Sequence, residues 1–477
     1  MALDMLFMLN ALVWFVLITV LGIKSIVLSL VLILTIAWTA ESLIDYGILP
    51  DNIPDVIFIY VILLLFTRMI FNRRKHDHSL RLPGLPMFLG FLGVSYLSAL
   101  LNDIEFLRYL LYVRHFTMFY IFFLGMININ MSEIEIKKIN KYMVFIFILQ
   151  IVVATGKWLV FPHTAGQFGQ ESLTGTYATH GGVFHTLLPL MAMAFIIPAY
   201  FTYGKKIFVV LFWSFIWFSM IGQKRAIIFI LPLFALYILY IMRGRFKVDF
   251  NFVKLFTIVT SVGLAMFLII TVNHTLNREE TIGGSFDLQY VLDYAQKYTT
   301  GQSTIGNTEY AAGRYAATTA IIDRIRSEPL HLLLGYGAGI GLRTGIVENR
   351  FHESFLSFGI EDGITGFVWV VAQIGILGVF FLMAFIFKLF RIVFQSYKSC
   401  TDDYWKIFFV GTLGNFGVFA FDFLAYSDSF VTNETLLVTF FYYISICFQY
   451  QRIHVHEPVV ATVKRRIGFS HPVPARI

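Results

Sequence analysis

Residues 207–242 read IFVVLFWSFIWFSMIGQKRAIIFILPLFALYILYIM, which is two apolar runs joined by a short polar turn. A membrane-spanning helix needs roughly 20 predominantly apolar residues, and each run comes close to that length. Helices joined by a short connection are antiparallel neighbours. The stretch therefore predicts two membrane helices, over 207–222 and 226–242, with the basic pair Lys224 and Arg225 at the tip of their connection.

The same apolar pattern continues along the chain. Of 477 residues, 58% are hydrophobic and only 14% are charged, whereas soluble domains are about 45–50% apolar and about 25% charged. We predict a single domain over residues 1–477, an all-α polytopic transmembrane bundle of about 12–13 spans. The expected spans lie near 5–22, 25–42, 54–71, 84–100, 108–128, 142–161, 183–202, 207–222, 226–242, 253–272, 364–389, 404–424 and 431–449.

Loop charges predict the orientation of the bundle. Basic clusters fall on alternate connections, at residues 73–81, 137–141, 205–206, 243–247 and 388–398. Short cytoplasmic loops are rich in Lys and Arg, so we expect these connections inside and residues 162–182, 222–225 and 273–363 outside. This distribution indicates a multi-pass protein of the bacterial inner membrane. It also accounts for the net charge of +7 without a nucleic-acid partner.

Processing signals and disulfides are not expected. The first residues, Met-Ala-Leu-Asp-Met, lack the positive start of a cleavable signal peptide. Cys400 and Cys447 lie in or next to spans on the cytoplasmic side, which does not favour a disulfide framework.

Lys224 and Arg225 break the charge bias, because they lie on an outer connection. Charged residues at the edge of a membrane tend to be functional, and a cation at an outer mouth suits a phosphate group. The alternative is that both side chains extend to lipid headgroups while their aliphatic stems stay in the apolar layer.

The long outer segment, residues 273–363, carries a second set of candidates. An amphipathic pattern over 308–327 predicts a helix that Pro329 should stop. Arg314 lies on this helix, and a guanidinium matches phosphate oxygens two at a time. A glycine cluster follows, and flexible glycines let backbone N–H groups approach an anion; it includes Gly335, Gly337, Gly339 and Gly341. The alternative is a solvated helix face and an ordinary loop.

Two histidines and a lone arginine complete the candidates. His352 lies in a short amphipathic stretch near Arg343 and Arg350, and a histidine can take a proton from a hydroxyl. His180 ends a glycine-rich polar turn, which either lines a sugar cavity or is a simple turn. Arg114 lies inside a predicted span, where it reaches a lipid phosphate or pairs with an acid; Asp422, near the outer end of another span, is a weaker candidate.

Several site types are missing from the sequence. It has no Walker-type phosphate loop, no dinucleotide fingerprint and no His/Cys cluster with zinc spacing. An enzyme built here would rest on arginine and histidine, and we expect neither a cofactor nor a metal.

Four local patterns, in order, resemble the bacterial O-antigen ligase and Wzy-type O-antigen or exopolysaccharide polymerase superfamily. They lie within residues 170–390, and the matching segments are Thr174–His180, Gln223–Ala226, Gly313-Arg314 with Pro329 and Gly335-Tyr336-Gly337, and His352 with Leu356, Glu361, Gly363 and Gly366. Two positions depart from the family pattern. Glu353 replaces the usual Asn after the histidine, and Lys224 replaces the serine before the outer arginine.

The resemblance implies a periplasmic transferase that moves a glycan from undecaprenyl diphosphate to an acceptor sugar hydroxyl. By this resemblance, Arg225 and Arg314 would bind the diphosphate and His352 would act at the acceptor hydroxyl, with a chain-length regulator as a further partner. We favour a polymerase over a ligase acting on lipid A–core, because Glu353 suggests a different acceptor. Two alternatives of other classes are a transporter for lipid-linked oligosaccharide and a scaffold subunit that binds lipid headgroups. A transporter would be expected to show an internal repeat, and none is found.

Overall fold

The computed structural model describes residues 25–45, 59–60, 62–65, 67, 81–161, 168–177, 182–243, 252–305, 308–340, 358–360 and 363–455. Within these residues, six helices are long and apolar enough to cross a membrane. They are α5 (Phe106–Asn128), α6 (Glu133–Val160), α7 (Phe184–Tyr203), α10 (Phe252–Val272), α15 (Gly366–Ser399), and α16 (Asp403–Phe421) with its π-helical continuation η2 (Asp422–Tyr426). The predicted all-α polytopic bundle is confirmed.

Shorter or less apolar helices complete the bundle. They are α2 (Ile26–Asp45), α4 (Leu85–Leu101), α8 (Lys206–Ile221), α9 (Ala226–Met242), α17 (Ser429–Thr432) and α18 (Glu434–Val455). The pair α8–α9 matches the expected bounds to within one residue at every end. The expected span 5–22 and most of 54–71 lie outside the described residues.

Helix α7 is the centre of the bundle. Of its most apolar 18-residue window, 89% is buried inside the protein, against 33% for α6 and α10. A helix that is apolar on all sides belongs in the interior, and α7 packs against α8, α9 and α16. The exposed apolar faces of α6 and α10 are therefore the surfaces that suit lipid.

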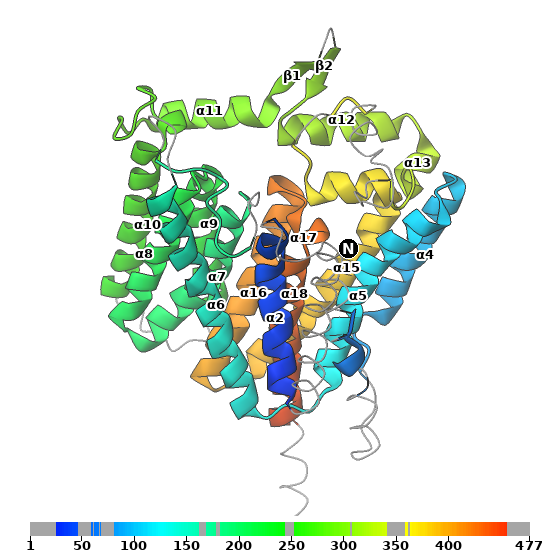
Figure 1. The fold of residues 1–477 in the computed structure, drawn as a ribbon, viewed down its shortest axis with the longest axis horizontal. Coiled ribbons are helices and arrows are strands. Elements are labelled where there is room, and N and C mark those ends of the chain that lie inside the picture. Colours follow the sequence, from blue (N-terminus) through cyan, green and yellow to red (C-terminus); the bar gives the residue numbers. More distant parts are fainter. Residues whose placement is uncertain are drawn as a thin grey trace, which may run out of the picture.

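The segment after α10 lies across one end of the bundle (Figure 1). It consists of η1 (His274–Leu276), α11 (Leu288–Thr300), strands β1 (Gln302–Ile305) and β2 (Thr308–Ala311), α12 (Arg314–Arg326) and α13 (Pro329–Leu334). We call this end the loop face. It is the end at which the α8–α9 connection also lies.

One detail of the expected helix over 308–327 is wrong. Residues 308–311 form β2, which pairs antiparallel with β1, and the helix begins only at Arg314. The pairing continues past β2, because the N–H groups of Ala312 and Gly313 both donate to the carbonyl of Gly301. Helix α12 ends at Arg326, before Pro329 as expected, and Pro329 begins α13, where its missing N–H removes no helical hydrogen bond.

Helix α15 is broken at Gly375, and the break anchors the loop segment. Gly375 has φ 65° and ψ −171°, which interrupts the helical hydrogen bonds. The freed carbonyls of Ala372 and Gln373 accept from the N–H groups of Tyr336 (2.8 Å) and Gly337 (3.1 Å). A Cβ on Gly375 would stand 2.4 Å from the carbonyl carbon of Leu333, so only glycine allows this approach.

Candidate functional site

The α8–α9 connection is a tight turn that packs against His185 and is hydrogen-bonded by Asn273. Gly222 ends α8, and a Cβ there would stand 2.1 Å from Cγ of the buried His185. Gln223 adopts a positive φ of 50°, and its carbonyl accepts from the side chain of Asn273 (3.0 Å). This geometry directs the next two residues, Lys224 and Arg225, toward the loop face.

Lys224 is mostly buried and paired. Its Nζ lies 2.5 Å from Oε1 of Glu171, and its side chain is 12% exposed against 68% for Glu171. Burial lowers the pKa of Lys224, and the neighbouring Glu171 carboxylate partly offsets that by raising it. Gly182 makes room for the pair, since a Cβ there would come within 2.7 Å of both side chains.

Arg225 and Arg314 meet at one tyrosine ring. The guanidinium carbon of Arg225 lies 4.9 Å from the ring centre of Tyr294 and 5.7 Å from that of Tyr298. The guanidinium carbon of Arg314 lies 5.2 Å from the ring centre of Tyr298 and 5.2 Å from that of Tyr426. We call these five residues the arginine–tyrosine cluster. Since both guanidinium groups contact Tyr298, their carbons lie no more than about 11 Å apart.

The aromatic rings fix the directions of the arginines. Tyr294 and Tyr298 are four residues apart on α11, so they share a helix face and stack at 6.2 Å. Arg314 Nε donates to the carbonyl of Tyr426, which ends η2. Burial lowers the pKa of Arg225, although not enough to remove its charge at any ordinary pH.

Two acids lie beside the three cations. Asp422, fully buried, begins η2; its carboxylate accepts from the N–H of Phe430 (2.8 Å) and from the hydroxyl of Ser427. Arg314 is close enough to Asp422 to interact with it electrostatically. A π-helical turn at this place fits the frequent occurrence of such turns at functional sites. Glu171, which pairs with Lys224, is the second acid.

The glycine cluster has a structural role in this fold. The N–H of Gly335 donates to the carbonyl of His331 (2.8 Å), and that of Gly337 donates to Gln373. Gly335 lies against the break in α15 and its carbonyl accepts from the side chain of Asn102, whereas Gly337 lies against Asn102 and Ile104, which follow α4. Of these two donors, the Gly335 N–H caps α13 and the Gly337 N–H seats the loop segment on α15. A substrate-binding role for Gly335 and Gly337 stays a prediction.

The turn before α7 also proves to be a packed connection as far as Tyr177. The N–H of Thr176 donates to the side-chain oxygen of Gln150 (2.7 Å), and its hydroxyl donates to the carbonyl of Trp38 (2.9 Å). The ring of Tyr177 stacks on Phe184 with centres 3.7 Å apart. This part of the turn joins α2, α6 and α7.

Among the remaining candidates, the structure describes only Arg114, which is not in contact with the rings of the cluster. Arg114 is exposed on α5, beside His115, whose ring contacts the carbonyl of Val431. His180, Arg343, Arg350 and His352 lie outside the described residues. Their proposed roles stay predictions.

Sequence reasoning missed the tyrosines and Glu171. The four-residue spacing of Tyr294 and Tyr298 was a usable signal for an aromatic helix face. Tyr426 and Glu171 gave none, because their contacts depend on how distant segments pack. Among the described residues, no group of three or more His, Cys, Asp or Glu could hold a metal ion.

The chain matches no protein-family model, and no curated protein matches its sequence. The resemblance to the polymerase and ligase superfamily therefore rests only on the local patterns quoted above.

Proposed function

We propose that this protein is an inner-membrane glycosyltransferase with its site on the loop face, which would be the periplasmic side. It transfers a glycan from undecaprenyl diphosphate to a sugar hydroxyl, and polymerises O-antigen or exopolysaccharide repeat units. The observation that carries the proposal is the meeting of Arg225 and Arg314 at Tyr298 beside Lys224. Three cations from two separate segments, the α8–α9 connection and α12, at one end of a membrane bundle suit a diphosphate at the membrane surface.

The chemistry follows from the charges. The acceptor oxygen attacks the anomeric carbon, the bond from that carbon to the diphosphate oxygen breaks, and the diphosphate leaves with the electron pair. Negative charge grows on the departing oxygen, where prearranged guanidinium groups stabilise it. The acceptor hydroxyl gives its proton to a base, a role that we assign to His352 by family resemblance.

The arrangement favours an enzyme over a transporter. A transporter usually carries its substrate site near the membrane midplane, formed by broken helices of two repeats. Here the three cations lie at the loop face. The one break in a described long apolar helix, at Gly375, is filled by the loop segment rather than open to a cavity.

Reconstitution tests the proposal. Purified protein in liposomes is given lipid-linked oligosaccharide, and the products are sized on a gel. A ladder of longer lipid-linked glycans supports a polymerase, whereas transfer only after addition of lipid A–core indicates a ligase. If neither product forms and the lipid crosses the bilayer, the protein is a transporter and the proposal is wrong.

Matched variants connect the activity with the cluster. Arg314→Ala and Arg225→Ala are expected to lower turnover by about 10²–10³-fold, as removal of a transition-state donor does elsewhere. Arg326→Ala is the control, because Arg326 is exposed on the same helix as Arg314 and contacts none of the cluster rings. Equal activity in all three variants would remove the diphosphate role.

A further inference from the structure

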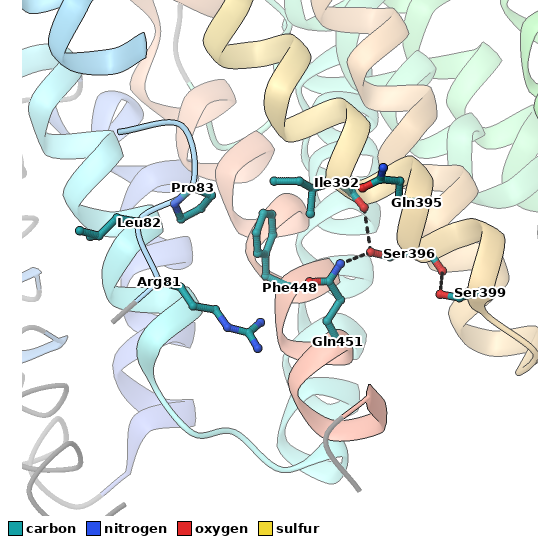
Figure 2. Close-up of a pocket in the computed structure, with 9 residues that line it drawn as sticks. All are labelled: Arg81, Leu82, Pro83, Ile392, Gln395, Ser396, Ser399, Phe448 and Gln451. Atoms are coloured by element: carbon teal, nitrogen blue, oxygen red, sulfur yellow. Dashed lines mark hydrogen bonds between the residues drawn. The ribbon is translucent and has the colours of Figure 1, made fainter. Parts of the chain in front are cut away.

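A cavity lies at the end of the bundle opposite the loop face (Figure 2). Its volume is about 650 Å³, within the range of small-molecule sites. It opens between the segment that leads into α4, the last turns of α15 and the last turns of α18. The lining residues are Arg81, Leu82, Pro83, Ile392, Gln395, Ser396, Ser399, Phe448 and Gln451.

The cavity is apolar toward the bundle and polar toward its end. Figure 2 shows Pro83, Ile392 and Phe448 nearer the middle of the bundle, with Arg81 and Gln451 nearer its end. The amide of Gln451 donates to the hydroxyl of Ser396, which fixes both side chains across the gap between α15 and α18. Such a gradient along one cavity matches a molecule with an apolar part and a polar head.

Two arginines give the polar end its charge. Arg81 lines the cavity, and Arg452 follows the lining residue Gln451 on α18. Arg452 is half-buried and close enough to Arg81 for the two cations to repel each other. None of the nine described lining residues is acidic. A bound anion would interact favourably with both guanidinium groups, and exposed hydroxyl and amide groups such as Ser399 and Gln395 add hydrogen-bond partners.

We propose that this cavity binds one anionic phospholipid, with its phosphate diester between Arg81 and Arg452 and the start of its acyl chains against Pro83, Ile392 and Phe448. A soluble phosphate compound would use the arginines but not the apolar wall. Basic cavities between membrane helices on the cytoplasmic side bind anionic headgroups in this way. The site is separate from the arginine–tyrosine cluster, and the proposal does not depend on the transferase activity.

Native mass spectrometry of the delipidated full chain tests the site. Phosphatidylglycerol and phosphatidylcholine are added in turn at equal concentration, and bound lipid is counted. We expect one tightly bound phosphatidylglycerol, retained at least tenfold better than phosphatidylcholine. The double variant Arg81→Gln/Arg452→Gln should abolish this preference. Lys205→Gln should not, because Lys205 is an exposed cation between α7 and α8 that does not line the cavity.

A second variant guards against a folding defect in the first. Ser399 is exposed at the rim, so Ser399→Glu adds a negative charge there without disturbing the core and should also weaken binding. Equal retention of the two lipids, or unchanged phosphatidylglycerol binding in both variants, would overturn the proposal. Displacement of the lipid by millimolar glycerol phosphate would also overturn it, since a soluble phosphate compound would then be the ligand.

Discussion

Gly222→Ala is expected to destabilise the protein because the added methyl group would overlap the side chain of His185. The new Cβ would stand 2.1, 2.3 and 2.6 Å from Cγ, Cδ2 and Cβ of His185. Carbon atoms prefer separations of about 3.5–4.0 Å, so the ring or the turn must move by more than about 1 Å. Gly222 has an ordinary φ of −79°, and the substitution therefore tests packing without backbone strain.

The histidine has little freedom to give way. Its Nδ1 lies 2.7 Å from the carbonyl of Phe218, and its own carbonyl accepts from the hydroxyl of Ser219. Overpacking a well-filled site typically costs about 1–3 kcal/mol, and the size of this overlap places Gly222→Ala at about 3 kcal/mol. The displaced turn also moves Arg225 away from Tyr298, so transferase activity should fall along with stability.

A double-mutant cycle with His185→Ala isolates this overlap. Unfolding by detergent titration in mixed micelles gives the free energies of the wild type, the two single variants and the double variant. In the His185→Ala background, Gly222→Ala should destabilise the protein by at least about 2 kcal/mol less, because contacting residues are strongly coupled. If Gly222→Ala costs the same in both backgrounds, within about 0.5 kcal/mol, the assigned contact is not the source of the cost.

Three further substitutions test the site and its support. Tyr298→Leu removes the cation–π partner that both arginines share, an interaction worth about 1–2 kcal/mol, and should weaken donor binding by roughly 5–30-fold. Tyr298→Phe keeps the ring and is the control. An equal loss of binding in both variants would assign the effect to the hydroxyl. Glu171→Gln removes the group that raises the pKa of Lys224, so the lysine should lose its proton at a lower pH and the alkaline limit of donor binding should shift downward; an unchanged limit would exclude Lys224 as a ligand. Gly335→Ala adds a Cβ 2.4 Å from backbone atoms of α15, at a residue with a φ of 74°. It should lower the free energy of unfolding by about 3 kcal/mol or more in detergent titrations. Gly283 is the control, because it has a φ of 85° but open space around it, so Gly283→Ala should show only the effect of backbone strain.

Apolar run length was enough to locate the membrane helices that the structure describes. The connection between α8 and α9 was placed within one residue, because Gly222 and the charged pair interrupt two long apolar runs. The start of α12 was predicted too early, at Thr308, because residues 308–312 contain no glycine or proline that would interrupt a helix before Gly313. Their strand conformation comes from pairing with β1, a partner that periodicity within one segment does not reveal.

Arg225 and Arg314 were identified as candidates from residue type and loop position alone. Their neighbours were not, because Tyr298 reaches Arg225 only when α11 lies against the α8–α9 connection, and Tyr426 reaches Arg314 only when η2 packs against α12. A tyrosine every fourth residue gives a helix an aromatic face but does not say what that face covers. The contacts between segments thus complete a site of which the sequence showed only the charged members.

The glycine cluster shows why residue type alone leaves the role of a sequence motif open. Gly335 and Gly337 each meet two needs, a positive φ and a close approach to a neighbouring segment, which is the backbone of α15 for Gly335 and the side chains of Asn102 and Ile104 for Gly337. An anion-binding loop has the same needs, so the residue type does not distinguish them. The break at Gly375 adds a structural need, because it exposes two carbonyls that must find donors within an apolar bundle. Tyr336 and Gly337 supply those donors, and the loop segment that carries Arg314 is thereby held over the bundle.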